Sequence, residues 1–170
     1  LVVNEAKEYI EEIEKWGTIF DKKSDGKYDL VREGGHSERR ILHHKDNTGF
    51  EIQRALTNQV MNHPDIELRE HCFTLDIITQ HHLGMEVNKN TEGIECYGAY
   101  VLDMKSNEIE TILAKTTLIA TGGIGYIYQS TTNPPFATGD GIAMVYRAKG
   151  KINDMEFVQF HPTALYNPKE

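Results

Sequence analysis

Apolar side chains recur at helical spacing between residues 4 and 16. The positions three or four residues apart hold Ala6, Tyr9, Ile10, Ile13 and Trp16. Glu and Lys fill most positions between them and Gly17 follows, which predicts an amphipathic helix that packs one apolar stripe against a core.

A second helix is predicted to begin at Thr48, because Thr48 and Glu51 have the spacing of a capping box, and to end before Pro64. Between these helices, residues 18–47 are polar and irregular, with a turn at 24–26 between two short strands.

From residue 66 the pattern changes to alternating and β-branched residues. Four segments are predicted to be strands: residues 66–68, 72–79, 97–104 and 109–113. Residues 116–120 form a short apolar run that ends in glycines, which predicts a buried strand. Gly139-Asp140-Gly141 then precedes a helix predicted over residues 142–148. This order predicts an α/β nucleotide-binding domain interrupted by a small antiparallel β-meander.

The composition narrows the possible partners. Among 170 residues, 18 are basic and 26 are acidic, which gives a net charge of −8 and argues against a nucleic-acid-binding surface. The charged fraction of 26% is ordinary for a globular domain. No apolar run approaches the ~20 residues of a membrane span, so we expect none. The chain begins with Leu1 rather than Met, and we expect it to be part of a longer protein.

Cysteine and histidine spacing does not favour a metal site. Cys72 and Cys96 lack CxxC spacing, and we interpret both as reduced, packed thiols. The histidines at 43–44 and 81–82 are adjacent pairs, whose side chains diverge on a regular element rather than converge on one ion. We therefore expect no bound metal.

Two glycine-rich stretches are candidates for ligand binding. The glycines at 122, 123 and 125 do not complete a GxGxxG fingerprint, because Tyr128 occupies its third glycine position. They allow either close backbone approach to a ligand or an ordinary tight turn. Gly139-Asp140-Gly141 opens a helix, whose N-terminus favours anions. Asp140 is either the N-cap of that helix or an acceptor for ligand hydroxyls.

Two further clusters contain polar groups suited to a small polar substrate. His161 follows an apolar run and precedes Pro162, so it is either a satisfied core histidine or a directed hydrogen-bonding group. Glu33 lies beside Gly34, Gly35 and His36 in a predicted loop. It is either a solvated loop acid or part of a site, since loops often carry functional residues.

Four motifs occur in order at close spacing: Ala120-Thr121-Gly122-Gly123, Thr131-Thr132-Asn133-Pro134, Thr138-Gly139-Asp140-Gly141-Ile142-Ala143-Met144 and Glu156-Phe157-Val158-Gln159-Phe160-His161-Pro162-Thr163. This combination resembles the flavoprotein family of succinate dehydrogenase, fumarate reductase and L-aspartate oxidase, over about the whole chain. Within the family, Arg32-Glu33-Gly34-Gly35-His36-Ser37 followed by Arg39-Arg40-Ile41-Leu42-His43 resembles the L-aspartate oxidases. Succinate and fumarate enzymes typically carry Phe where Glu33 stands.

The resemblance implies an internal fragment of a longer flavoprotein. Residues 1–154 would be the central part of an FAD-binding Rossmann-like domain with an inserted antiparallel β-meander, and residues 155–170 the beginning of a substrate-capping domain. His161 would hydrogen-bond a substrate carboxylate, and Glu33 would orient the substrate amine. The acid/base arginine of the family would lie outside this chain. The residues implied to lie at the FAD cofactor are Ala120, Thr121, Gly122, Gly123, Gly139, Asp140 and Gly141.

The implied activity is a cytoplasmic, FAD-dependent oxidation of L-aspartate to iminoaspartate, with dioxygen or fumarate as electron acceptor. The substrates would be small dicarboxylates, and the product would pass to quinolinate synthase in NAD biosynthesis. One alternative is a flavoprotein subunit of a succinate dehydrogenase or fumarate reductase, distinguished by an apolar residue in place of Glu33. The other is a non-catalytic nucleotide-binding module.

We predict that the 170-residue chain expressed alone binds FAD weakly or not at all. It contains no complete GxGxxG stretch, and such a stretch supplies the main anion site for the pyrophosphate. Gel filtration followed by an absorbance spectrum measures the retained flavin. A stoichiometric yellow protein would contradict this prediction.

Overall fold

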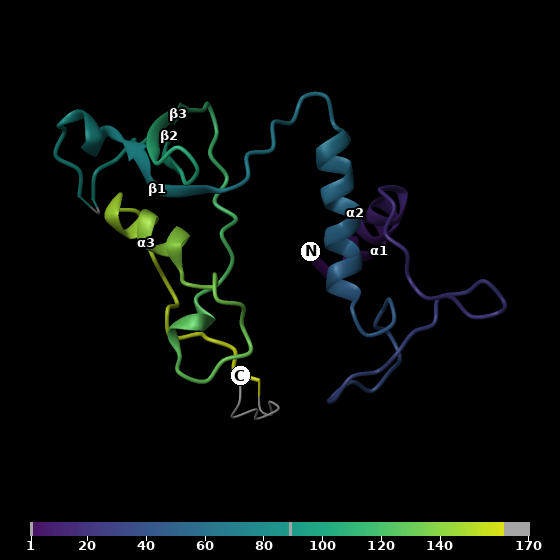
Figure 1. Ribbon diagram of the computed structural model, residues 1–170. Helices are drawn as coiled ribbons and strands as arrows, with labels where there is room; N and C mark the ends of the chain where they lie inside the picture. The colour runs from purple at the N-terminus through teal and green to yellow at the C-terminus, as the bar shows by residue number, and fades with distance from the viewer. Residues whose placement is uncertain (1, 89, 162–170) are drawn as a thin grey trace. The chain divides into compact units, whose positions relative to one another are not determined.

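The computed structural model describes residues 2–88 and 90–161, which belong to two compact units, Leu1–Arg69 and Glu70–Glu170 (Figure 1). The first unit holds two helices, α1 (Val2–Lys15) and α2 (Thr48–Asn62). The second holds strands β1 (Cys72–Thr79), β2 (Cys96–Asp103) and β3 (Glu108–Leu113), helix α3 (Asp140–Arg147) and the 3₁₀ turns η1 (Gln80–Leu83) and η2 (Gly125–Ile127). In the described part of the chain, no helix has the length and apolar content to cross a membrane.

Both helices of the first unit lie where the apolar spacing predicts them, but the start of α2 differs from the predicted capping box. Asn47 occupies the N-cap position, and no side chain caps the helix. The Thr48 hydroxyl instead accepts a hydrogen bond from the His44 backbone N–H at 3.1 Å. The capping-box prediction is therefore wrong, and the Glu51 carboxylate has other partners.

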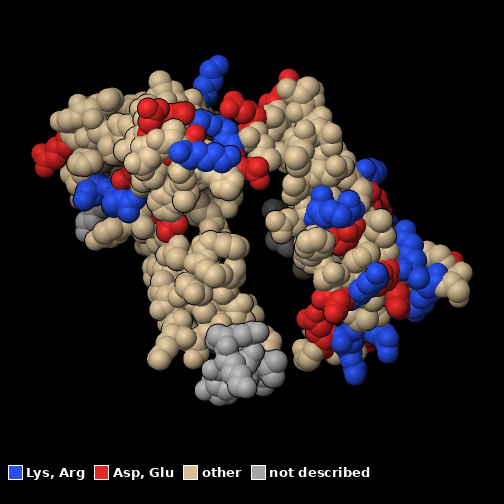
Figure 2. Space-filling view, in the orientation of Figure 1, with Lys and Arg blue, Asp and Glu red and all other residues tan. Residues whose placement is uncertain are grey.

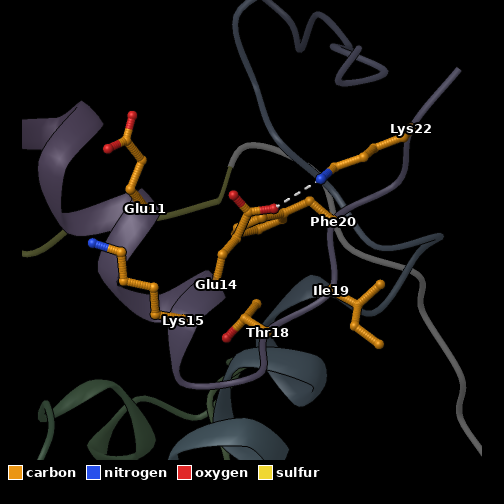
Figure 3. Close-up of a pocket in the computed structure, with 7 residues that line it drawn as sticks. All are labelled: Glu11, Glu14, Lys15, Thr18, Ile19, Phe20 and Lys22. Atoms are coloured by element: carbon orange, nitrogen blue, oxygen red, sulfur yellow. Dashed lines mark ion pairs between the residues drawn. The ribbon is translucent and has the colours of Figure 1, made fainter. Parts of the chain in front are cut away.

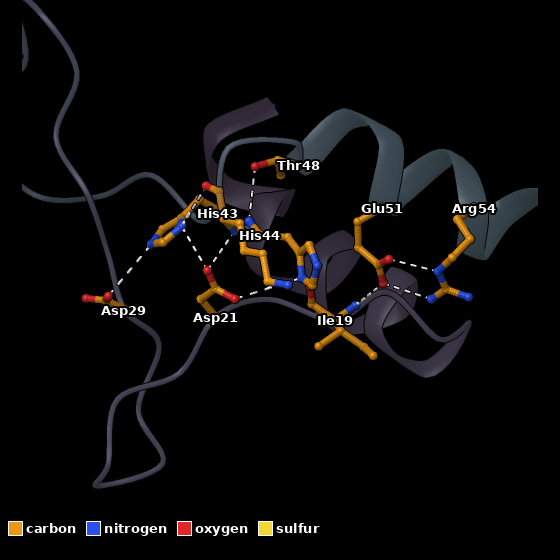
Figure 4. Close-up of polar contacts among 9 residues, drawn as sticks. Ile19, Asp21, Asp29, His43, His44, Thr48, Glu51 and Arg54 are labelled. Carbon is orange, nitrogen blue, oxygen red and sulfur yellow. Dashed lines mark hydrogen bonds and ion pairs between the residues drawn. The ribbon is translucent and has the colours of Figure 1, made fainter.

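The Glu51 side chain is only 7% exposed and joins α2 to the segment after α1 (Figure 4). Its carboxylate accepts hydrogen bonds from the Ile19 N–H at 2.9 Å and from Nε and Nη2 of Arg54, each at 2.8 Å. Hydrogen bonds from Arg54 and then from the Ile19 backbone lower the pKa of Glu51 from 4.5 to about 2, against the opposing effect of burial. These donors stabilise a carboxylate that burial alone would disfavour. We call Glu51, Arg54 and the Ile19 N–H the Glu51 anchor.

Beyond the anchor, residues 20–44 fold back on themselves through a few backbone hydrogen bonds. Asp21 N–H donates to the His43 carbonyl at 2.8 Å, and Asp29 N–H donates to the Asp21 carbonyl at 2.9 Å. The predicted turn near residue 25 is confirmed, because Gly26 N–H donates to the Lys23 carbonyl at 2.9 Å. The two strands predicted beside it are reduced to an isolated bridge between residues 22 and 28.

The second unit contains a three-stranded antiparallel sheet in the order β1-β2-β3, as the alternating segments predict. Cys72 pairs with Asp103, and Gly98 pairs with Leu113. The turn predicted before β3 is present, with the Asn107 N–H donating to the Asp103 carbonyl at 2.8 Å. Residues 66–68 are not a strand, and that prediction is wrong. Three alternating residues are too short a signal when the segment has no ladder partner.

The core of the second unit lies between α3 and the sheet. Ile77, Met144 and Ala148 are buried together, with Cys96 and Val145 packed against them. Arg147 ties the end of α3 to β1 by donating from Nε to the Asp76 carboxylate at 3.0 Å and from Nη2 to the Leu75 carbonyl at 2.7 Å. Both cysteines are free thiols.

Residues 116–120 are not a strand, contrary to the prediction from their apolar sequence. Leu118 is 87% exposed, and no described strand runs beside this segment. A β-strand requires a hydrogen-bonded neighbour, so β propensity alone does not form one. The antiparallel sheet is thus present, whereas its insertion into a larger parallel sheet stays a prediction.

We predict that Glu51 makes the stability of the first unit depend on pH. Its folded pKa of about 2 lies below the ordinary 4.5, so its contribution is present above about pH 4.5 and is lost as the pH falls towards 2. Glu51→Gln should lower the free energy of unfolding at pH 6, and the difference from wild type should shrink at pH 3. Denaturant titrations followed by fluorescence of Trp16, the single tryptophan, measure this difference.

The matched control is Glu67→Gln, because the Glu67 side chain is 84% exposed and belongs to the same unit. This variant should follow the wild-type pH profile. A wild-type minus Glu51→Gln difference that stays constant from pH 6 to pH 3 would show that the Glu51 carboxylate is not selectively stabilised in the folded state.

Candidate functional site

The two glycine-rich stretches singled out in the sequence lie against each other in the second unit. Gly139 N–H donates to the Gly123 carbonyl at 3.1 Å. Gly141 N–H donates to the Thr121 hydroxyl, also at 3.1 Å. The segment that was predicted to be a strand is therefore fixed at its glycine end to the first residues of α3.

This contact requires glycine at two positions. A Cβ on Gly141 would lie 2.2 Å from the Thr121 Oγ1 and 2.7 Å from Cγ2 of Ile119. Gly139 has a φ of +79°, and a Cβ there would lie 2.8 Å from two side-chain carbons of Ile124. Since real Cβ atoms do not approach other atoms this closely, a larger residue would force the side chains of Ile119, Thr121 and Ile124 to move. The glycines thus bring two backbone segments together at one end of α3, as an extended nucleotide cofactor requires.

Asp140 is the first residue of α3, and Gly139 is its N-cap. The N-cap interpretation of Asp140 is therefore wrong. The carboxylate is half-buried and accepts a hydrogen bond from the Thr138 hydroxyl at 2.9 Å. A carboxylate at a helix N-terminus is favoured by the helix dipole, and its remaining acceptor capacity suits ligand hydroxyls. This geometry is compatible with the FAD contact that the resemblance implies.

The segment around these glycines carries no charged side chain. Residues 116–139 contain no Lys, Arg, Asp or Glu, and Figure 2 shows this part of the second unit without blue or red side chains. Ala120, Gly122 and Gly123 are exposed, and a Cβ on Gly122 would meet only open space. A neutral, exposed backbone of this kind suits the flat, largely apolar ring system of a cofactor such as FAD better than it suits a metal ion. The described residues also hold no cluster of three or more His, Cys, Asp or Glu able to bind a metal.

Glu33 lies in the first unit at the head of a tight turn. Its backbone carbonyl accepts the His36 N–H at 3.1 Å, and Gly35 between them has a φ of +81°. The Glu33 side chain is exposed, whereas His36 is half-buried and its Nδ1 is shielded without a hydrogen-bond partner among the described residues. An exposed carboxylate at the head of a glycine turn is accessible to a cationic group.

His161 is the last described residue of the second unit, and it is exposed rather than part of the core. The ring of the preceding Phe160 meets Tyr128 edge-on, with centroids 5.0 Å apart. This contact orients the segment that leads to His161. Pro162 and Thr163, which complete the motif, lie outside the described residues, as does most of the segment assigned to the capping domain.

The structure thus brings together the predicted residues at 121–123 and 139–141. Glu33 belongs to the other compact unit, and each unit is described by itself.

None of the residues predicted for the site lines the open pocket of about 580 Å³ in the first unit (Figure 3). That pocket lies beside the end of α1 and is lined by Glu11, Glu14, Lys15, Thr18, Ile19, Phe20 and Lys22. Its Glu14 and Lys22 pair at 3.4 Å, so their charges are mutually compensated.

Sequence reasoning missed one polar cluster, which surrounds Asp21. His43 Nδ1 lies 3.2 Å from Asp21 Oδ2, and Lys45 N–H donates to the same oxygen at 2.7 Å. In the sequence, His43 belongs to an adjacent histidine pair and to a motif that resembles the L-aspartate oxidases, but neither feature points to Asp21, because that pairing depends on a long-range fold. The only signal in the sequence was the closeness of His43 to the predicted Glu33 loop.

Comparison with known proteins assigns the chain to a family. The family described as FAD binding domain matches residues 1–170. L-aspartate oxidase 2-a of Nicotiana tabacum, a chloroplastic protein by its name, is 47% identical over 97% of this chain and 24% of its own length. L-aspartate oxidase 1 of Ralstonia nicotianae is 47% identical over 87% of this chain and 27% of its own length. The chain thus spans about a quarter of the length of these curated relatives.

The solved structures agree with this assignment. FrdA, in a variant of Escherichia coli quinol fumarate reductase, superposes with a TM-score of 0.75 at 27% sequence identity. The match covers 85% of this chain and 23% of the FrdA chain. Because the family model matches the whole sequence, the chain belongs to the FAD binding domain family.

Proposed function

We propose that this chain is part of an FAD-dependent L-aspartate oxidase, which converts L-aspartate to iminoaspartate. The observation that carries this proposal is Glu33, an exposed carboxylate at the head of a glycine turn, within a motif that resembles the L-aspartate oxidases. The names of the similar curated proteins support the same reading.

The argument for Glu33 is electrostatic. Aspartate and succinate share two carboxylates and differ by one ammonium group. An ammonium that loses its hydration without gaining an acceptor is costly, so a site for aspartate needs an acidic partner for it. Glu33 supplies that acceptor, and Gly34 and Gly35 have no side chains to obstruct approach to it. A phenylalanine at this position would suit the methylene group of succinate instead.

The other residues take complementary roles in the proposal. Asp140 accepts hydrogen bonds from FAD hydroxyls, and the backbone of residues 120–123, 139 and 141 approaches the cofactor closely. His161 donates a hydrogen bond to a substrate carboxylate and so orients the substrate. When bound, FAD supplies the two-electron chemistry that no side chain provides. The acid/base arginine is expected in the part of the protein outside this chain.

Two other functions remain as alternatives. The likeness to FrdA favours a flavoprotein subunit of a fumarate reductase or succinate dehydrogenase. Glu33 argues against it, because an apolar residue would suit those substrates better. A non-catalytic nucleotide-binding module would bind flavin without turnover. Four further points stay predictions of the same proposal. They are dioxygen or fumarate as the electron acceptor, transfer of the product to quinolinate synthase, a cytoplasmic location, and a domain boundary between residues 154 and 155.

Asp140→Asn in the complete protein should weaken FAD binding. A hydrogen bond to a charged group contributes about 1.5 to 3 kcal/mol, which corresponds to a rise of roughly tenfold to a hundredfold in the dissociation constant. Flavin fluorescence during titration of the apoprotein measures this constant. Asp154→Asn is the control, because Asp154 is exposed and is assigned no role. Equal affinities in wild type and Asp140→Asn would remove Asp140 from the proposed site.

Glu33→Gln tests the proposed function directly. In the complete protein it should raise the KM for aspartate on the order of tenfold or more, because a neutral amide replaces the partner of the ammonium. Fumarate reduction, which involves no amine, should change much less. Glu38→Gln is the matched control, since Glu38 is also exposed and lies in the same loop. Equal losses with both substrates would mean that Glu33 supports the loop and does not bind the amine.

A further inference from the structure

The loop that carries Glu33 begins and ends at a narrow base. Val31 and Ile41 form an isolated antiparallel bridge, with N–H to carbonyl distances of 3.0 and 3.1 Å in the two directions. Residues 32–40 lie between these two positions, and we call them the Glu33 loop. Two residues outside the bridge on either side are Asp29 and His43. The placement of Glu33 therefore depends on what holds this base.

At the base, the His43 side chain lies between two carboxylates (Figure 4). Its Nδ1 is 3.2 Å from Asp21 Oδ2, and its Nε2 is 3.8 Å from Asp29 Oδ2. The His43 side chain is only 17% exposed, whereas the Asp21 and Asp29 side chains are 31% and 43% exposed. The Nε2 atom is buried and has no hydrogen-bond partner in the described part of the chain, and Asp29 Oδ2 is the carboxylate oxygen paired with it.

The backbone of Asp21 connects the same three segments. Asp21 N–H donates to the His43 carbonyl and its carbonyl accepts the Asp29 N–H, at 2.8 and 2.9 Å. The side chain of His43 therefore contacts the same two segments, at Asp21 and Asp29, that the backbone hydrogen bonds of Asp21 join to His43. We call the set of Asp21, Asp29 and His43 the loop clamp.

We propose that His43 is a positioning residue that holds the base of the Glu33 loop by bridging Asp21 and Asp29. This inference rests on the proposed function, in which Glu33 binds the substrate amine. His43 does not need to touch the substrate. It fixes the two ends of the loop, and misplacement of a binding group by about 1 Å can cost on the order of a hundredfold in rate.

The neighbouring groups explain why His43 rather than His44 is the bridge. His44 Nδ1 contacts the Ile19 carbonyl at 2.8 Å and lies 3.8 Å from Asp21 Oδ1. It therefore faces the Glu51 anchor and not Asp29. Lys45 reaches Asp21 only through its backbone N–H. Of the described basic side chains paired with Asp21, His43 is the one also paired with Asp29.

Limited trypsin digestion of the complete protein tests the clamp without an activity assay. Arg39 and Arg40 are exposed cleavage sites inside the Glu33 loop. His43→Gln should speed cleavage there severalfold, because a loop with a loosened base opens more often. His63→Gln is the matched control, because His63 is an exposed histidine of the same unit, and it should leave the rate at these two sites close to wild type. Asp29→Asn changes the carboxylate on the other side of the same contact, at a side chain that is 43% exposed, and it should act like His43→Gln even if the latter folds poorly.

The activity of the complete protein separates the clamp from the proposed function. His43→Gln should raise the KM for aspartate about tenfold and leave fumarate reduction little changed, as a misplaced Glu33 would. Added to Glu33→Gln, it should have little further effect on aspartate, because the residue that it positions no longer binds the amine.

The possible failures are distinguishable. If Glu33→Gln itself leaves the aspartate KM unchanged, the proposed function fails, and the trypsin result still decides whether the clamp exists. If Glu33→Gln is selective for aspartate while His43→Gln is not, Glu33 acts as proposed and His43 does not position it. Unchanged cleavage at Arg39 and Arg40 in both His43→Gln and Asp29→Asn overturns the clamp.

Discussion

The fold of the first unit depends on one buried carboxylate. Glu51 is held by Arg54 from its own helix and by the Ile19 N–H from the segment after α1. A buried charge without such partners would be strongly destabilising, so the segment at Ile19 must lie against α2. Two residues later, Asp21 pairs with the segments at 29 and 43. The position of the Glu33 loop thus follows from the anchor through a short chain of hydrogen bonds rather than from a large apolar core.

The second unit uses a different constraint. Its core of Ile77, Met144 and Ala148 fixes α3 on the sheet, which is ordinary apolar packing. The candidate cofactor site is then formed at the free end of that helix, where Gly139 and Gly141 let residues 121–124 approach. Both the sheet and the glycine contact are therefore needed to present Asp140. The two units contribute different groups to the proposed function: an acid for the amine, and a neutral backbone with one carboxylate for the cofactor.

The sequence predicted the parts of the fold that depend on local pattern. The apolar stripe from Ala6 to Trp16 and the β-branched runs within 72–113 correspond to α1 and to the three strands, because their spacing alone selects helix or strand. Predictions that depended on a partner were wrong. Glu51 has the spacing of a capping box, but a long-range contact with Ile19 competes for its carboxylate. Residues 116–120 have strand composition, but no described neighbour pairs with them.

For the candidate site, the family resemblance implies that residues 120–123 and 139–141 lie at the FAD cofactor. The structure brings residues 121–123 and 139–141 together, and their contact with the cofactor stays a prediction. The assignment of Asp140 between helix cap and ligand acceptor required the structure, since only backbone angles identify Gly139 as the N-cap. The His43 contacts could not be predicted. Asp21 and Asp29 are 22 and 14 residues away in the chain, and no local periodicity relates such positions.

The most direct measurement compares aspartate and succinate as substrates for the complete wild-type protein, with its flavin content determined in the same preparation. The account predicts a flavin-containing enzyme that oxidises L-aspartate, with succinate oxidised far more slowly under identical conditions. Oxidation of succinate without oxidation of aspartate would contradict it, and would place the protein with the succinate- and fumarate-linked flavoproteins.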